Sequence, residues 1–392
     1  MTSDPAAFRT VRRMTARDRA EHHRVATPLE LFFDLCFVVA VGQAGRELAG
    51  SLAEGHYGVG IPGYLLSFFA IWWAWMNFTW FASAYDVDDV PYRVTTLVQI
   101  AGVLILAAGV PRAFESHDYA LFVIGYAVMR LALVTQWLRA AQACAGPERT
   151  MTLRYAGGVA LCQLGWWPAL LLVPDGAGRT VAALVMIVAE LSVPVIAERR
   201  TQTSWHPHHI SERYGLFTLI VLGETVAAAT VAVQSGLDEH EALGRLIAVA
   251  AGGLLICFSA WWVYFAEPIH DHLRSNRQAF VWGYGHYLVF LGAAAIGSGL
   301  EVAVEHAVGQ AHVSGTVAAA TVTVPTALYL LTVWVLHARH VKTGAAQAVL
   351  PLAAAATLAC TAAGEHAVLP TGLVSAAAVA AGLTFRARRA RG

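Results

Sequence analysis

The sequence predicts an all-α, polytopic membrane protein with about twelve transmembrane helices. Hydrophobic residues make up 57% of the 392-residue chain and charged residues only 13%, about half the charged fraction of an ordinary soluble domain. Apolar runs of about 20 residues, the length that an α-helix needs to cross a bilayer, recur along the whole chain. This composition excludes a water-soluble globule and argues against nucleic acid as a partner.

Hydropathy and helix-breaking residues divide the chain into twelve expected spans. Their limits are 28–50, 61–84, 92–110, 118–141, 152–173, 179–197, 210–233, 242–265, 278–300, 315–337, 345–363 and 367–385. The last two are rich in alanine, so the sequence defines their ends least well. We expect a basic tail over 1–27, two six-helix halves over 28–200 and 201–385, and a second basic tail over 386–392.

Basic residues fall mainly on one side of these spans. Both tails and the even-numbered loops carry most of the arginines, and the opposite side of the spans has only Arg46, Arg112, Arg179 and Arg245. Because cytoplasmic loops are enriched in basic residues, both termini are expected in the cytoplasm. The N-terminal tail lacks the apolar core of a cleavable signal peptide, so the first span is expected to direct membrane insertion.

The two halves of the sequence echo each other. Trp80-Phe81-Ala82 is followed four residues later by Asp86, and Tyr264-Phe265-Ala266 is followed four residues later by His270. Six spans in each half would give both repeats the same orientation, so we predict a parallel internal duplication. Chance similarity between aromatic-rich helices is the alternative.

Ionisable residues lie within several of the expected spans. Glu30 and Asp34 are four residues apart, which places both carboxylates on one helical face. A carboxylate in hydrocarbon costs about 3 kcal/mol or more, and such groups mark ion or substrate paths. The residues assigned to such a path are Glu30, Asp34, Arg130, Glu190, Glu224 and His286. A buried arginine needs an acidic partner, and Asp34, Glu190 or Glu224 is expected to pair with Arg130. Ion pairs that only fix helix packing are the alternative to such a path.

A second polar set is expected at the cytoplasmic face. It comprises His22, His23, Asp86, Asp88, Asp89, His206, His208, His209, Glu212, Arg213, His270, Asp271 and His272. Histidine with carboxylate is metal-ligand chemistry, and the loose spacing makes His206, His208, His270 and His272 the candidates for a metal ion. Interfacial or pH-responsive polar residues are the alternative, and no other cofactor is predicted.

Tryptophans cluster in two of the spans. Trp72, Trp73, Trp75, Trp261 and Trp262 are candidates to line a cavity for an organic substrate, with packing or an interfacial belt as the alternative. The five cysteines show no paired spacing, which is typical of packing residues. No nucleotide-binding, hydrolase or metalloprotease motif lies in a suitable context, so no catalytic residue is assigned and transport is favoured over catalysis.

Three segments carry a family resemblance. The run from Thr27 to Val38, the run from His208 to Phe217, and Leu222-Gly223-Glu224 resemble the bacterial low temperature requirement protein A (LtrA) family, over roughly Arg24 to His340. The resemblance implies an integral protein of the bacterial cytoplasmic membrane, linked by name to growth in the cold, with no settled biochemical activity. The positions that carry over are Glu30, Asp34, Glu212, Arg213 and Glu224.

These observations favour a permease coupled to a proton or cation. Glu30, Asp34 and Glu224 would bind the ion, Arg130 would balance charge, and the deep tryptophans would contact a small organic substrate. Transport would proceed by rocking one half against the other. One rival is a membrane-embedded metal-dependent enzyme or sensor that uses the cytoplasmic His/Asp set, and another is a structural protein of cold adaptation. Membrane lipids are expected partners, and the sequence leaves the substrate and homo-oligomerisation open.

Overall fold

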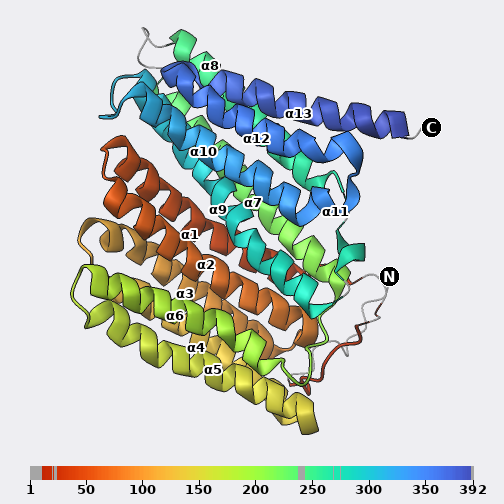
Figure 1. The fold of residues 1–392 in the computed structure, drawn as a ribbon. Helices are drawn as coiled ribbons and strands as arrows, with labels where there is room; N and C mark the ends of the chain where they lie inside the picture. The colour runs from red at the N-terminus through yellow and green to blue at the C-terminus, as the bar shows by residue number, and fades with distance from the viewer. Residues whose placement is uncertain are drawn as a thin grey trace, which may run out of the picture. The chain divides into compact units, whose positions relative to one another are not determined.

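The computed structural model describes residues 11–19, 21, 24–236, 243–267, 269–273 and 275–389, which form helices and connecting segments without a β-strand (Figure 1). The α-helices are α1 (Pro28–Ala53), α2 (Tyr57–Tyr85), α3 (Val90–Glu115), α4 (Ala120–Ala143), α5 (Gly146–Leu171), α6 (Ala177–Ala197), α7 (Pro207–Gly236), α8 (Leu243–Phe265), α9 (Asn276–Ala307), α10 (Gly315–Val333), α11 (Arg339–Val341), α12 (Val349–Ala359) and α13 (Val368–Arg389). Short 3₁₀ segments lie at His270–His272, Gly344–Ala348 and Cys360–His366, and a π-helical turn at Trp334–Ala338.

Ten helical segments within the described residues are long and apolar enough to cross a membrane, which confirms a multi-pass membrane protein. They correspond to all the expected spans except 152–173 and 210–233. Those two form α5 and α7, helices of 26 and 30 residues that contain charged and amide side chains. That α5 and α7 also cross the membrane stays a prediction.

The ends of the last two spans are fixed by backbone geometry. The apolar segment Gly344–His366 is followed by α13, whereas the sequence predicted 345–363 and 367–385. Gly364 has φ 55° and ψ −132°, a conformation that glycine adopts without steric cost. It therefore breaks the helical path just before α13.

The contacts between Cα atoms divide the chain into two compact units. Unit 1 comprises Met1–Ala40 and Ala70–Tyr214, and unit 2 comprises Val41–Phe69 and Gly215–Gly392. The boundaries fall within α1, α2 and α7, so each of these helices contributes to both units. The expected halves, 28–200 and 201–385, have their boundary before α7 instead, and the duplication itself stays a prediction.

In unit 1, α3 packs on α4, α4 on α5, and α5 on α6 (Figure 1). Glycines bring α3 and α4 close together. A Cβ on Gly109 would lie 2.5 Å from the backbone nitrogen of Phe122, and one on Gly125 would lie 2.3 Å from that of Leu106. Small residues at such contacts are the usual means of tight packing between membrane helices.

The described part of the N-terminal tail packs within unit 1. The backbone nitrogen of Arg17 donates to the carbonyl of Ala84 at 2.8 Å, and Met14 is buried. Asp89 accepts from the backbone nitrogen of Arg12 at 2.7 Å and pairs with Arg139. The segment before α1 is therefore tied to the helix ends that surround it.

In unit 2, α9 packs on α10, α8 packs on α13, and α12 contacts both α10 and α13 (Figure 1). The contact between α8 and α13 is again made by glycines. A Cβ on Gly252 would lie 2.5 Å from the carbonyl oxygen of Val368, and one on Gly372 would lie 2.6 Å from that of Gly252. This close approach fixes α13 beside α8.

Candidate ion site in unit 1

The start of α1 positions the first carboxylate. Glu30 Oε2 accepts from the backbone nitrogen of Thr27 at 2.8 Å, and Thr27 Oγ1 accepts from the backbone nitrogen of Glu30 at 3.3 Å. This reciprocal pair is a capping box, and Pro28 occupies the first helical position, where its missing N–H costs nothing. Thr-Pro-Leu-Glu thus begins the helix and fixes the side chain of Glu30.

Arg213 from α7 joins both carboxylates of α1. Its Nη1 lies 2.9 Å from Oε1 of Glu30. Its Nη2 donates to Oδ1 of Asp34 at 2.6 Å and its Nε to Oδ2 at 3.1 Å, the bidentate geometry that favours arginine over lysine. All three side chains are fully buried. One guanidinium therefore balances two carboxylates.

His209, one helical turn before Arg213, completes the site. Its Nε2 lies 3.1 Å from Oε1 of Glu30. The ring is fully buried, and among the residues that the structure describes no partner reaches Nδ1. A turn of α7 therefore presents Arg213 and His209 together to the carboxylates.

Two more buried charges lie near this site. Arg24 donates from Nη2 to the carbonyl of Ala82 at 2.7 Å, and its Nε and Nη1 have no hydrogen-bond partner within the described ranges. Asp86 accepts from the backbone nitrogen of Asp88 at 2.9 Å. Burial raises the pKa of Asp86 to about 6; nearby Glu30 adds to this increase and Arg24 opposes it.

Arg130 and Glu190 form a second, separate buried pair. Nη2 of Arg130 donates to Oε2 of Glu190 at 2.7 Å. Trp73 also donates to this carboxylate at 2.9 Å, and Tyr126 and Gln163 each donate at 3.2 Å. The donors come from α2, α4 and α5, and the acceptor from α6. Glu190, rather than Asp34 or Glu224, is thus the partner of Arg130, and its carboxylate has four hydrogen-bond donors.

The deep tryptophans of α2 bind carboxylates. Trp75 donates to Oδ1 of Asp34 at 2.6 Å and Trp73 to Glu190. Both rings and that of Trp72 are buried. The cavity-lining role predicted for them stays a prediction; their contacts here are hydrogen bonds and packing. Trp261 and Trp262 of α8 are partly exposed on unit 2, and Trp262 borders a pocket.

The remaining path residues belong to unit 2. Glu224 is partly exposed, and its Oε1 lies 3.7 Å from Nη1 of Arg46. His286 is buried, with Nδ1 2.7 Å from the carbonyl of Trp282 and Nε2 3.0 Å from the hydroxyl of Tyr264. His337, in the π-helical turn, accepts from the indole of Trp282 at 3.2 Å.

The polar set predicted at the cytoplasmic face is distributed over both units. In unit 1, Asp88 pairs with Arg93, Asp89 caps α3, and the backbone nitrogen of Ala26 donates to Glu212 at 3.1 Å.

His206 Nε2 lies 2.9 Å from the carbonyl of Glu21, and the rings of His206 and His208 are 6.5 Å apart. His270, Asp271 and His272 belong to unit 2, and His22 and His23 lie outside the described residues. Within those residues, no three metal-binding side chains are grouped to hold an ion.

Comparison with known proteins places this site within a family. The model of the bacterial low temperature requirement A protein (LtrA) matches residues 25–385. The chain belongs to the LtrA family. It is also 25% identical, over 300 residues, to the uncharacterized protein RA0937 of Rhizobium meliloti (strain 1021), covering 71% of this chain and 69% of the relative. No solved structure matches.

The matched region of this LtrA protein contains both buried clusters of unit 1. The sequence identified both carboxylates of the first cluster, and the family pattern identified Arg213. Neither the sequence nor the family pattern identified Thr27 as the cap, Arg24 as a buried cation, or Gln163 and Tyr126 as donors to Glu190. A threonine three residues before Glu30 was a readable capping signal, whereas the other contacts depend on which helices are neighbours.

Proposed function

We propose that this LtrA protein is a proton-coupled membrane transporter in which Glu30, Asp34 and His209 form the proton site. The observation that carries the proposal is the charge of the buried cluster. Two carboxylates share one guanidinium, so with a neutral His209 the cluster has an excess of negative charge. Arg24 and an ionised Asp86 add one charge of each sign and leave this excess unchanged.

A buried charge without a counter-ion is unstable by several kcal/mol, so such a site takes up a proton or a cation. Burial lowers the pKa of His209 to about 4, which keeps the ring neutral at rest, and Glu30, 3.1 Å from its Nε2, opposes this shift and is the group that would stabilise a proton there. A protonated imidazole would form an ion pair with Glu30 and make the cluster neutral. Binding and release of this proton would give the protein two charge states on which transport can depend.

The Arg130–Glu190 pair supports this assignment by contrast. It contains one charge of each sign, and four donors surround the carboxylate. We assign it to helix packing, because nothing in its charge calls for a further ion. In this proposal the Glu30–Asp34–Arg213 cluster is functional, and the Arg130–Glu190 pair, also buried in unit 1, is structural.

Further parts of the proposal rest on sequence. Glu224 is a second candidate proton carrier, in unit 2. The bias of basic residues supports a cytoplasmic location for both termini, which a fluorescent protein fused to the C-terminus tests, because it matures in the cytoplasm and fails to do so outside. The similarity between the two halves of the sequence supports transport by rocking of one half against the other.

Proton flux into proteoliposomes tests the proposal directly. A potassium gradient with valinomycin sets the membrane potential, and a trapped pH dye records proton entry, first without solute and then with small organic solutes added singly. We expect wild-type flux above that of empty liposomes, and a loss of at least about tenfold in Asp34→Asn and His209→Gln. Asp88→Asn, which alters an exposed pair with Arg93, should retain the flux. Wild-type rates in Asp34→Asn would overturn the proposal.

A further inference from the structure

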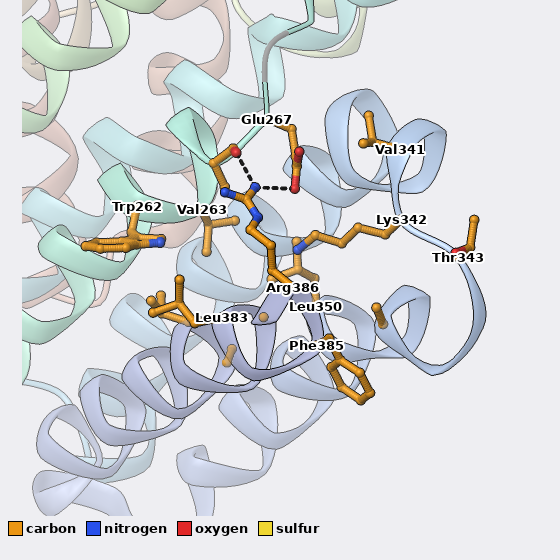
Figure 2. A pocket seen from close by; sticks show the side chains of 15 residues that line it. Trp262, Val263, Glu267, Val341, Lys342, Thr343, Leu350, Leu383, Phe385 and Arg386 are labelled. Carbon is orange, nitrogen blue, oxygen red and sulfur yellow. Dashed lines mark hydrogen bonds and ion pairs between the residues drawn. The ribbon is translucent and has the colours of Figure 1, made fainter. Parts of the chain in front are cut away.

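Unit 2 contains a pocket with two cationic side chains at one end of its helices. The pocket has a volume of about 450 Å³, within the range of small-molecule sites. Its walls come from the ends of α8 and α13, from the segment after α11, and from the start of α12 (Figure 2). The candidate spans Leu243–Phe265, Gly315–Val341 and Val368–Arg388 all end here, so the pocket lies where a membrane would meet water.

The two cations of the pocket differ in their partners. Arg386 donates from Nη2 to the carbonyl of Ala266 and to Oε1 of Glu267, each at 2.5 Å. Lys342 extends into the same pocket (Figure 2), and within the described parts of the chain its ammonium has no hydrogen bond or ion pair. Lys342, Arg386 and Glu267 together leave one positive charge in excess.

The rest of the lining is apolar. Trp262, Leu350, Val379 and Leu383 form walls beside the charged groups. Gly382 lies beside the ammonium, since a Cβ on it would be in van der Waals contact with Lys342 Nζ at 3.7 Å. A ligand that fits has one negative charge and apolar parts beside it.

We propose that this pocket binds the phosphate group of an anionic phospholipid through Lys342. A phosphodiester carries one negative charge, which matches the excess of the pocket, and acyl chains can lie against the apolar walls. Basic pockets between membrane helices are a known means of holding such headgroups. Free phosphate has the same chemistry without the apolar part, so the location at the membrane boundary favours the lipid.

Occupancy of the pocket can be followed through the reactivity of the Lys342 amine, because Lys342 is the only lysine in the sequence. Burial lowers its pKa, Glu267 opposes this shift and Arg386 adds to it, so the unoccupied amine is reactive towards acylating reagents. A bound phosphate would raise the pKa and cover the amine. Acylation of Lys342 should therefore slow when the ligand binds.

The experiment measures acylation of Lys342 by a neutral reagent in full-length protein reconstituted in nanodiscs. We expect the rate in phosphatidylglycerol to be at least about fivefold lower than in phosphatidylcholine. A protein carrying Lys342→Arg and Arg388→Lys has its single lysine beyond the pocket lining and reports the effect of the charged surface alone. It should show a difference of less than about twofold.

Two variants separate charge from space. Lys342→Gln should lose phosphatidylglycerol retained through detergent purification, measured by native mass spectrometry, and Lys342→Arg should keep it. Gly382→Leu fills the pocket without removing charge and should also lose the lipid. Equal acylation of wild type in both lipids overturns the proposal. Equal protection by inorganic phosphate in phosphatidylcholine nanodiscs overturns the lipid as the source of the phosphate.

Discussion

Arg213 and Asp34 form a two-bond ion pair inside unit 1, with Nη2 2.6 Å from Oδ1 and Nε 3.1 Å from Oδ2. The remaining nitrogen, Nη1, faces Glu30 at 2.9 Å. The guanidinium therefore forms two hydrogen bonds to Asp34 and an ion pair with Glu30. This geometry ties the first turns of α1 to the first turns of α7.

Replacement of Arg213 by lysine tests how far that geometry matters. A single ammonium cannot reproduce the fork, so one carboxylate loses its direct partner in a buried site. We expect Arg213→Lys to lower the free energy of unfolding by about 2–4 kcal/mol, measured by denaturation in mild detergent. Arg149→Lys changes an exposed residue and should stay within about 0.5 kcal/mol of wild type. Equal stability of the two variants would show that the fork contributes nothing.

Asp86 predicts a pH dependence of stability. Burial raises its pKa from 3.8 to about 6, so between these values the folded protein binds the proton more tightly than the unfolded chain does. The contribution of Asp86 to stability, measured as the difference between wild type and Asp86→Asn, should therefore fall as pH rises from about 4 to about 6, by up to about 3 kcal/mol, and then level off. Asp86→Asn should remove this decline. Unfolding of both proteins in detergent across this range provides the measurement.

Asp88 supplies a control of opposite sign. The hydrogen bond from Arg93 lowers the pKa of Asp88, so its contribution is present above the ordinary carboxyl pKa and is lost as pH falls. Asp88→Asn should therefore leave the decline between pH 4 and 6 in place. If Asp88→Asn removes that decline and Asp86→Asn does not, the assignment to Asp86 is wrong.

The sequence predicted the helices and the polar candidates better than their pairing. Glu30 and Asp34 were placed on one face by their spacing, and the structure puts both against Arg213. The partner of Arg130 stayed open among three acids, because the choice depends on whether α6 lies beside α4. The indole contacts of Trp73 and Trp75 depend likewise on the rotation of α2. Such facts arise from helix packing, which periodicity in one chain does not encode.

The division into units also lay beyond sequence reasoning. Hydropathy assigns each span as a whole to one half or the other, whereas α1, α2 and α7 each contribute to both units. Long helices with uniform hydropathy give no signal of such a change of partners. The similarity between the two halves of the sequence concerns the order of spans along the chain, whereas the two units are defined by contacts between Cα atoms.

Gly42 in unit 2 predicts a selective effect on Glu224. A Cβ on Gly42 would lie 2.2 Å from Oε1 of Glu224, so Gly42→Ala must displace this carboxylate. The displaced atoms are the end of a flexible side chain, and stability should change by less than about 1 kcal/mol. If Glu224 carries protons, Gly42→Ala should reduce proton flux as Glu224→Gln does. Gly223→Ala meets no atom within 4 Å and should leave flux unchanged; equal flux in all three variants would remove Glu224 from the proposal.

The charge difference between the two buried clusters predicts different responses to neutralisation. Glu190→Gln leaves Arg130 buried without a carboxylate and should cost about 3–5 kcal/mol. Asp34→Asn removes the excess negative charge and leaves Glu30 paired with Arg213 at 2.9 Å, so it should cost no more than about 1–2 kcal/mol. Unfolding of both variants in the same detergent gives the comparison. If Asp34→Asn is as destabilising as Glu190→Gln, the site has no excess charge for a proton to neutralise, and the Glu30–Asp34–Arg213 cluster is structural in the same sense as the Arg130–Glu190 pair.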